Sequence, residues 1–317
     1  MPFFVTVTQV GLLLLYAVPG YLFVRFRFLD ADRHILPISK ILVYVCQPCL
    51  EVYAFCSAKR TPSLLAEMGW FFLLCTVLQV VLMGALFLIL RKRKKAFEDV
   101  RARVCAFAAA FGNVGFFGIP LLEALLPESV AADAVALSAV FAVSMNWLAW
   151  TVGLRMISGD PKRVRVRAVL LNPATLALVV ALPLFLTGFQ LPDAVGNAVG
   201  LCGKMATPLC MIVLGMRLAA TKWKQIFSDP FAWLASAGKL LVLPALAFLL
   251  CLFLPLPDYF KAALFLLCCC PTASAVQNFS EISLSESEGK ETAANSVLLS
   301  NLLCVLTIPL LALLIHV

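Results

Sequence analysis

Two short stretches of the chain combine amide side chains with residues that interrupt helices. The first is Phe111–Pro120, FGNVGFFGIP, and the second is 270–278, CPTASAVQN. Amide side chains donate and accept hydrogen bonds, and backbone released from a helix does the same, so both stretches have the chemistry to bind a polar solute. The candidate binding residues in them are Asn113, Gly115, Gly118, Pro120, Pro271, Thr272 and Asn278.

The elements that carry these stretches are predicted to span a membrane. Of the 317 residues, 62% are hydrophobic and 13% are charged, against about 25% charged in soluble domains. Apolar runs of about 20 residues, enough to cross a hydrocarbon core of about 30 Å, recur throughout, and none alternates as a barrel strand would. These runs predict an all-α polytopic membrane protein with ten spans, at roughly 3–24, 35–57, 64–90, 103–126, 131–157, 169–188, 194–219, 231–254, 260–283 and 292–316.

The basic residues predict the orientation of these spans. Of the 25 Lys and Arg residues, 19 lie in loops after odd-numbered spans and 3 in loops on the other side. The positive-inside rule then places the odd loops in the cytoplasm and both termini outside, in the plasma membrane or the inner membrane of a bacterium. No basic residue precedes the first run, so we expect a span there and not a cleaved signal peptide. Because the basic residues are scattered beside lipid, we expect the bilayer as a partner and no nucleic acid.

An approximate repeat divides the chain into two halves. Residues 132–138 match residues 294–300 at four of seven positions, and Pro48 and Pro208 are separated along the chain by nearly the same distance as these two segments. Five spans per half, an odd number, make the second half insert upside down. We therefore expect one transmembrane domain of two inverted five-helix repeats, 1–157 and 168–317.

The interruptions in the fourth and ninth spans stand at matching places in the two halves. Proline inside a helix costs about 3 kcal/mol and glycine about 1 kcal/mol, and freed backbone groups in lipid cost several more. One such kink alone is equally compatible with close helix packing. A matched pair predicts crossed, broken helices that meet near mid-membrane, with half-helix N-termini directed toward an anion.

These stretches also resemble a known family. Phe111–Pro120 resembles the fourth-span signature of the auxin efflux carrier family, which includes bacterial members. Looser similarities are Asn172-Pro173, Thr207–Leu209 with Leu214-Gly215, Pro271, and Ser300–Pro309, in the family's order; Asn301 and the cysteines before Pro271 depart from its pattern. The resemblance implies a fold similar to that of bile-acid/sodium symporters. It also implies a core of spans 3–5 and 8–10 that moves against spans 1, 2, 6 and 7, with organic anions as cargo.

Charged residues inside spans are candidates for coupling to an ion. Lys40, Tyr44, Gln47 and Glu51 share one helix face that should meet protein or water. Glu51 could carry a proton or anchor the outer interface. Glu123 could titrate, answer a substrate cation or lie at the outer rim. Lys204 and Lys239 could pair with Glu51, attract an anion or extend their amines to the interface.

The sequence therefore predicts a secondary active transporter for small carboxylates, such as dicarboxylates or auxin-like weak acids, working by alternating access. The alternatives are a sodium-coupled organic-anion symporter, a channel or a sensor. We expect no enzyme activity, metal or cofactor, but coupling to H⁺ or Na⁺ and a homodimer are open. The two histidines form no catalytic cluster, and Cys46-x-x-Cys49 is interpreted as packing and not as a redox pair.

Overall fold

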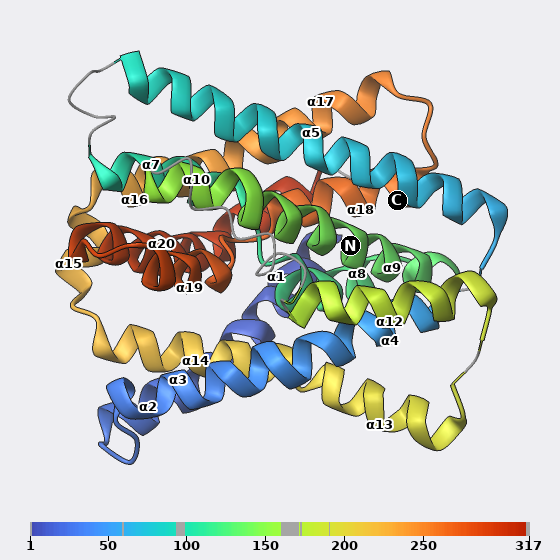
Figure 1. Ribbon diagram of the computed structural model, residues 1–317, viewed down its shortest axis with the longest axis horizontal. Helices are drawn as coiled ribbons and strands as arrows, with labels where there is room; N and C mark the ends of the chain where they lie inside the picture. Colours follow the sequence, from blue (N-terminus) through green and yellow to red (C-terminus); the bar gives the residue numbers. More distant parts are fainter. Residues whose placement is uncertain are drawn as a thin grey trace.

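The protein is an assembly of long, roughly parallel helices (Figure 1). The computed structural model describes residues 2–58, 60–92, 99–159, 171, 173–189 and 191–314. In these residues every regular element is helical and strands are absent. Up to residue 159 the helices, with η marking a π-helical turn, are α1 (Pro2–Leu15), α2 (Ala17–Arg25), α3 (Ala31–Ile41), η1 (Leu42–Cys46), α4 (Gln47–Ser57), α5 (Pro62–Lys92), α7 (Val100–Ala110), η2 (Val114–Gly118), α8 (Ile119–Leu125), α9 (Glu128–Leu148), η3 (Ala149–Gly153) and α10 (Leu154–Ser158).

The second half of the chain is helical in the same way. From residue 173 onward the helices are α12 (Pro173–Thr187), α13 (Asp193–Lys204), α14 (Ala206–Ala220), α15 (Trp223–Ser228), α16 (Pro230–Ala237), η4 (Gly238–Val242), α17 (Leu243–Phe253), α18 (Asp258–Cys269), α19 (Ser274–Ser283) and α20 (Ser287–Ala312).

Seven helical stretches in the described residues are long and apolar enough to cross a membrane. The remaining three predicted spans, 103–126, 169–188 and 260–283, fall on shorter helices: α7 with η2 and α8, α12, and α18 with α19. The seven stretches are Phe3–Arg25, Ala31–Ser57, Pro62–Lys92, Glu128–Ser158, Asp193–Ala220, Pro230–Phe253 and Ser287–Ala312. The chain is thus a multi-pass helical membrane protein.

Three of the four described π turns stand just before a proline. Pro48, Pro120 and Pro244 each follow the last residue of η1, η2 and η4 by two positions. Proline lacks an N–H and its ring collides with the carbonyl four residues earlier. Widening the preceding turn by one residue relieves this collision while the helix continues.

Many of the described helices fall into two packed groups, which also contact each other, as α4 does with α9. In one, α4 packs against α12 and α13, while α14 packs against α2 and α3; in the other, α5, α7, α9, α16, α18 and α20 pack against one another. The contact between α2 and α14 is especially close. A Cβ atom added at Gly20 would overlap the backbone of Ile212, and one added at Gly215 would overlap the backbone of Ala17. Small residues are what allow helix backbones to approach this closely in membranes.

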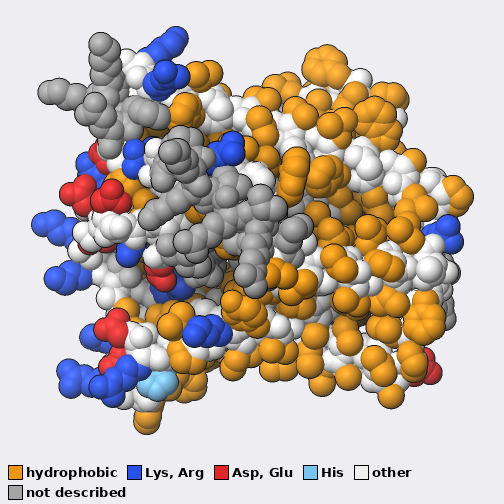
Figure 2. Space-filling view, viewed as in Figure 1, with side chains coloured by type: hydrophobic (Ala, Val, Ile, Leu, Met, Phe, Trp, Pro, Cys, Tyr) orange, Lys and Arg blue, Asp and Glu red, His pale blue; other side chains and the backbone are white. Residues whose placement is uncertain are grey.

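Charge is concentrated at one end of the molecule. Figure 2 shows most Lys, Arg, Asp and Glu side chains at the end that carries α15 and the turn between α2 and α3, while hydrophobic side chains cover most of the rest of that face. An apolar surface of this extent is suited to lipid contact. The basic segments 93–98 and 160–170, and Asn172, lie outside the described residues.

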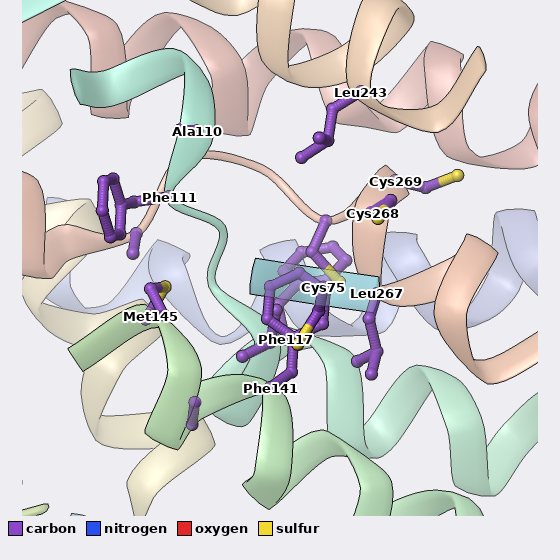
Figure 3. Close-up of a cluster of buried hydrophobic side chains, with 14 of the residues drawn as sticks. Cys75, Ala110, Phe111, Phe117, Phe141, Met145, Leu243, Leu267, Cys268 and Cys269 are labelled. Carbon is purple, nitrogen blue, oxygen red and sulfur yellow. The ribbon is translucent and has the colours of Figure 1, made fainter. Parts of the chain in front are cut away.

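A cluster of buried apolar side chains from α5, η2, α9 and α18 lies beside the non-helical chain that follows α7. Figure 3 shows Phe117, Phe141, Cys75 and Leu267 gathered beneath this chain. Phe117 and Phe141 are fully buried. This apolar packing holds the interrupted segment in place from behind.

Candidate functional site

Two helical segments that were predicted to be interrupted do contain non-helical residues. Between α7 and η2, residues 111–113 are not helical, and between α18 and α19, residues 270–273 are not helical. We call these two segments together the crossing. Glycine at 112 and proline at 271 account for the interruptions, since neither favours a helix interior.

The two segments of the crossing are hydrogen-bonded to each other through their backbones. The N–H of Asn113 donates to the carbonyl oxygen of Pro271 at 2.7 Å, and the N–H of Ala273 donates to that of Phe111 at 3.0 Å. They flank an antiparallel bridge between Gly112 and Thr272. Backbone groups freed by one interruption are therefore satisfied by the other, as burial requires.

Hydroxyl side chains satisfy further backbone groups around the crossing. The Oγ1 of Thr272 donates to the carbonyl of Ala108 at 3.3 Å, and the N–H of Thr272 donates to the Oγ of Ser300 at 3.0 Å. The Oγ1 of Thr207, on α14, donates to the carbonyl of Phe116 in η2 at 2.8 Å. Thr272 is fully buried, so its role is to hold the backbone of the crossing.

A cavity of about 460 Å³ lies against the crossing. It is lined by α3, η1 and α4 from one packed group and by α9 from the other, together with η2 and α19. Asn113 and Asn278 both line it, as do Ser138 and Ser274. Exposed residues among its lining include Glu281 near the end of α19, Leu36 and Lys40 on α3, and Tyr44 on η1.

Two helix N-termini face this cavity. Its lining includes the first residues of η2, which with α8 forms the helix Val114–Leu125, and the first residues of α19. A helix N-terminus carries about half a positive charge on its unsatisfied N–H groups. Two of them on one cavity, with amides beside them, favour a negatively charged solute.

The structure separates the predicted binding residues into two sets. Asn113, Gly115 and Asn278 line the cavity, whereas the other four are not among its lining residues. A Cβ atom added at Gly118 would meet Leu267 Cδ2 at 2.5 Å, so this glycine permits close packing against α18. The other three are Pro120, Pro271 and Thr272. The carbonyl of Pro120 accepts a 3.4 Å bond from Gln9, and Pro271 and Thr272 contribute to the crossing.

The candidates for coupling are also placed differently. Lys40, Tyr44, Gln47 and Glu51 all line the cavity, and Glu51 is 5% exposed. Glu123 is exposed and not among the lining residues.

Lys204 and Lys239, for which pairing with Glu51 was one alternative, contact other groups. Lys204 is exposed, and its ammonium lies 5.0 Å from the centre of the Tyr53 ring. Lys239 is fully buried, and its ammonium donates to the carbonyl of Cys268 at 2.6 Å. Of the alternatives left open for these two lysines, pairing with Glu51 is not seen, because each ammonium group contacts another partner.

Lys239 is the residue whose place the sequence did not indicate. It backs directly onto the crossing, since a Cβ atom at Gly112 would meet its Cε at 2.7 Å and its Nζ at 2.9 Å. Its partner, the Cys268 carbonyl, lies in the last turn of α18, where the helix dipole is negative. Its position inside an apolar span was the available signal, but only the fold shows which helix end it meets.

The cysteines show no redox pairing. All twelve are free thiols, including Cys46 and Cys49. One of them connects elements of the site: the Sγ of Cys210, on α14, lies 3.9 Å from the Nδ2 of Asn113 and 3.9 Å from the Oγ of Ser274. Cysteine here acts as a small packing residue between α14 and both interrupted helices.

Comparison with known proteins shows the family of the chain. The chain is 27% identical over 175 residues to the uncharacterized transporter YfdV of Escherichia coli K12, and equally to YfdV of Shigella flexneri. These matches cover 52% of this chain and 54% of the relatives, so the chain spans about half the length of the curated relatives it matches. A family model described as membrane transport protein matches residues 4–169 and 162–312. The chain therefore belongs to this membrane transport protein family, the auxin efflux carrier family that its fourth-span motif resembles.

Proposed function

We propose that the protein is a secondary carrier that moves small organic anions, such as dicarboxylates or auxin-like weak acids, across the plasma membrane. The observation that carries this proposal is the cavity at the crossing, lined by two helix N-termini, Asn113 and Asn278. The amides would hydrogen-bond a carboxylate while the helix ends stabilise its charge. A volume of about 460 Å³ suits a small solute, since ligand sites span about 300–1,000 Å³.

The proposed mechanism is alternating access, in which one packed group of helices moves against the other. The cavity lined by helices of both groups supports this mechanism, because relative movement there would change the side from which the crossing is reached. The bridged residues Gly112 and Thr272 are separated along the chain by the same interval as Pro48 and Pro208. This coincidence supports the proposal of ten spans in two inverted repeats, 1–157 and 168–317.

In the proposed orientation the basic loops lie in the cytoplasm and both termini outside. The cavity would then be open to the cytoplasm, because Glu281 lines it at the end of α19 that leads into α20, and the first half of α20 contacts α15 at the basic end. A sodium-coupled symporter of the same architecture is the second candidate, favoured by the carboxylate of Glu51 in the cavity wall. Sodium dependence separates the two candidates.

The test is counterflow of labelled carboxylate in liposomes that contain the purified protein. Malonate, malate and indole-3-acetate are used as probes, with and without sodium. We expect saturable exchange of at least one probe, and loss of that exchange in Asn113→Ala with the protein still folded and inserted. Asn197→Ala is the matched control, because Asn197 is exposed on α13 and is not a lining residue.

Three results would contradict the proposal. Conduction at channel rates would replace the carrier by a channel. Absence of exchange for all three probes would remove small carboxylates as cargo, and unchanged exchange in Asn113→Ala would remove this residue from the binding site.

A further inference from the structure

Glu51 is a buried carboxyl group in the wall of the cavity. It lies on α4 and is 5% exposed. Its Oε1 accepts a hydrogen bond from the Nε2 of Gln47 at 3.3 Å, whereas its buried Oε2 has no hydrogen-bond partner among the described residues. Removing an ionised carboxylate from water costs several kcal/mol unless a partner or a proton neutralises it.

The helices packed against α4 supply no cation for this carboxyl. They are η1, α9, α12 and α13. On them, α12 carries no ionisable side chain, η1 carries Tyr44 and Cys46, α9 carries Glu128 and Asp133, and α13 carries Asp193, Cys202 and Lys204. The one cation in this set, Lys204, lies over the Tyr53 ring.

The other lysines near the site are also unsuitable partners for Glu51. Lys40 also lines the cavity, but it stands about three helical turns before Glu51. Each turn of a helix rises by about 5.4 Å, so this separation along the axis is too long for an ion pair. Lys239 donates to Cys268 behind the crossing. Within the part of the chain that the structure describes, this carboxyl therefore has no cationic partner, and the cavity is where a neutralising charge can reach it.

An anionic cargo increases the need for a positive charge beside the Glu51 carboxylate. Two carboxylates that share one poorly hydrated site hold a proton between them, because both cannot stay ionised at close range. A metal ion would need several oxygen ligands at once, whereas the side chain that contacts Glu51, Gln47, donates an N–H to it. The proton is the cation that this site accommodates without further ligands.

We infer that Glu51 is the coupling residue of the carrier, which binds one proton as the anion binds and releases it as the anion leaves. This inference rests on the proposed function. The carboxylate of Glu51 takes up one proton and becomes a carboxylic acid with the anion beside it, so one positive charge enters the site together with the charge of the anion. Binding of either ligand then strengthens binding of the other by the same factor.

The experiment measures accumulation of ¹⁴C-malonate in liposomes containing the protein. Valinomycin with equal potassium on both sides holds the membrane potential at zero, and the outside is one pH unit more acidic. One coupled proton then gives about tenfold accumulation of malonate, since one pH unit corresponds to a factor of ten. Glu51→Gln is expected to exchange malonate without accumulating it, at a ratio of about one.

Two further variants make this result specific. Glu128→Gln removes an exposed carboxyl at the start of α9, away from the cavity, and should accumulate malonate like the wild type. Glu51→Asp keeps a carboxyl one methylene shorter. This variant should accumulate malonate about tenfold, with a pH profile of exchange that is shifted from that of the wild type. If Glu51→Gln does not fold, Glu51→Asp is the variant that tests the inference. An Asp variant with the wild-type profile would then contradict the inference.

The possible failures are distinguishable from one another. If wild-type protein does not exchange malonate, the proposed function fails for dicarboxylates and this inference fails with it. If wild type and Glu51→Gln accumulate malonate equally under the pH gradient, the carrier proposal stands and the inference is overturned. Accumulation driven by a sodium gradient and lost in Glu51→Gln would make Glu51 a sodium ligand, which also overturns it.

Discussion

At the scale of single residues, amides and a buried lysine stand on opposite sides of the crossing. Asn113 and Asn278 line the cavity, where helix N-termini are exposed to it. Lys239 lies behind Gly112 and binds a carbonyl in the last turn of α18. The two faces of the crossing are thus electrostatically different: the cavity face favours an anion, and the rear face is already neutralised by an ammonium group.

Lys239→Met should lower the thermal stability of the protein. The substitution keeps a long apolar side chain but removes the donor to the Cys268 carbonyl, in a fully buried place. Losing a hydrogen bond from a charged group costs about 1.5–3 kcal/mol. The measurement is the unfolding temperature of the detergent-purified protein. Lys204→Met, at an exposed position, is the control, and an equal loss in both variants would contradict the assigned role.

The residue types in the sequence predicted part of this site. Which of the candidate side chains face the cavity depends on the fold. Asn113 and Asn278 could be selected because they are the amides in the two stretches whose glycine and proline residues predict interruptions. Gly118 and Thr272 belong to the same stretches, yet they face α18 and the backbone of α7. Whether a residue beside an interruption points toward the cavity or toward the protein depends on the local turn, and no periodicity reveals that.

At the scale of elements, proline explains most of the irregular helix geometry. The interruptions were predictable from glycine and proline, but the π turns two residues before Pro48, Pro120 and Pro244 were not. Helix η3 widens without any proline nearby in its turn. A π turn holds one residue more than an α turn, but this changes neither the composition nor the apolar content of the span. The hydrophobic pattern therefore does not reveal where the π turns lie.

Gly215→Ala should destabilise the protein, while Gly84→Ala should not. A Cβ atom at Gly215 would overlap the backbone of Ala17 and force α2 and α14 apart, whereas at Gly84 no atom lies within 4 Å. Alanine is the better helix former by about 1 kcal/mol, so the two variants should change the unfolding temperature in opposite directions. A higher unfolding temperature in both variants would show that α2 and α14 can move apart without loss of stability.

At the scale of the whole molecule, the distribution of charge separates the two ends. Basic and acidic side chains gather at the end that carries α15, and apolar side chains dominate most of the rest of that view (Figure 2). The hydrophobic runs and the loop charges contain this information in the sequence, because both follow directly from the cost of placing charge in lipid. The number of membrane-spanning helices is harder to predict. Three predicted spans fall on helices that are each too short to cross a membrane alone.

A labelling experiment tests the orientation. Lys222→Cys, in the exposed turn before α15, should react with a membrane-impermeant maleimide only from the cytoplasmic side of the membrane. Asp193→Cys, at the exposed start of α13, should react only from the outside. The unsubstituted protein gives the background from native cysteines. The reverse pattern would invert the proposed topology.

The backbone pairing at the centre of the protein has a consequence for how selectivity can be altered. The atoms that join the two interrupted helices are the amide nitrogens of Asn113 and Ala273 and the carbonyl oxygens of Phe111 and Pro271. Main-chain atoms are present whatever side chain a position carries. Side chains such as that of Asn113 can therefore be exchanged to suit a different solute while the junction itself persists, which makes this site a good starting point for re-engineering cargo preference.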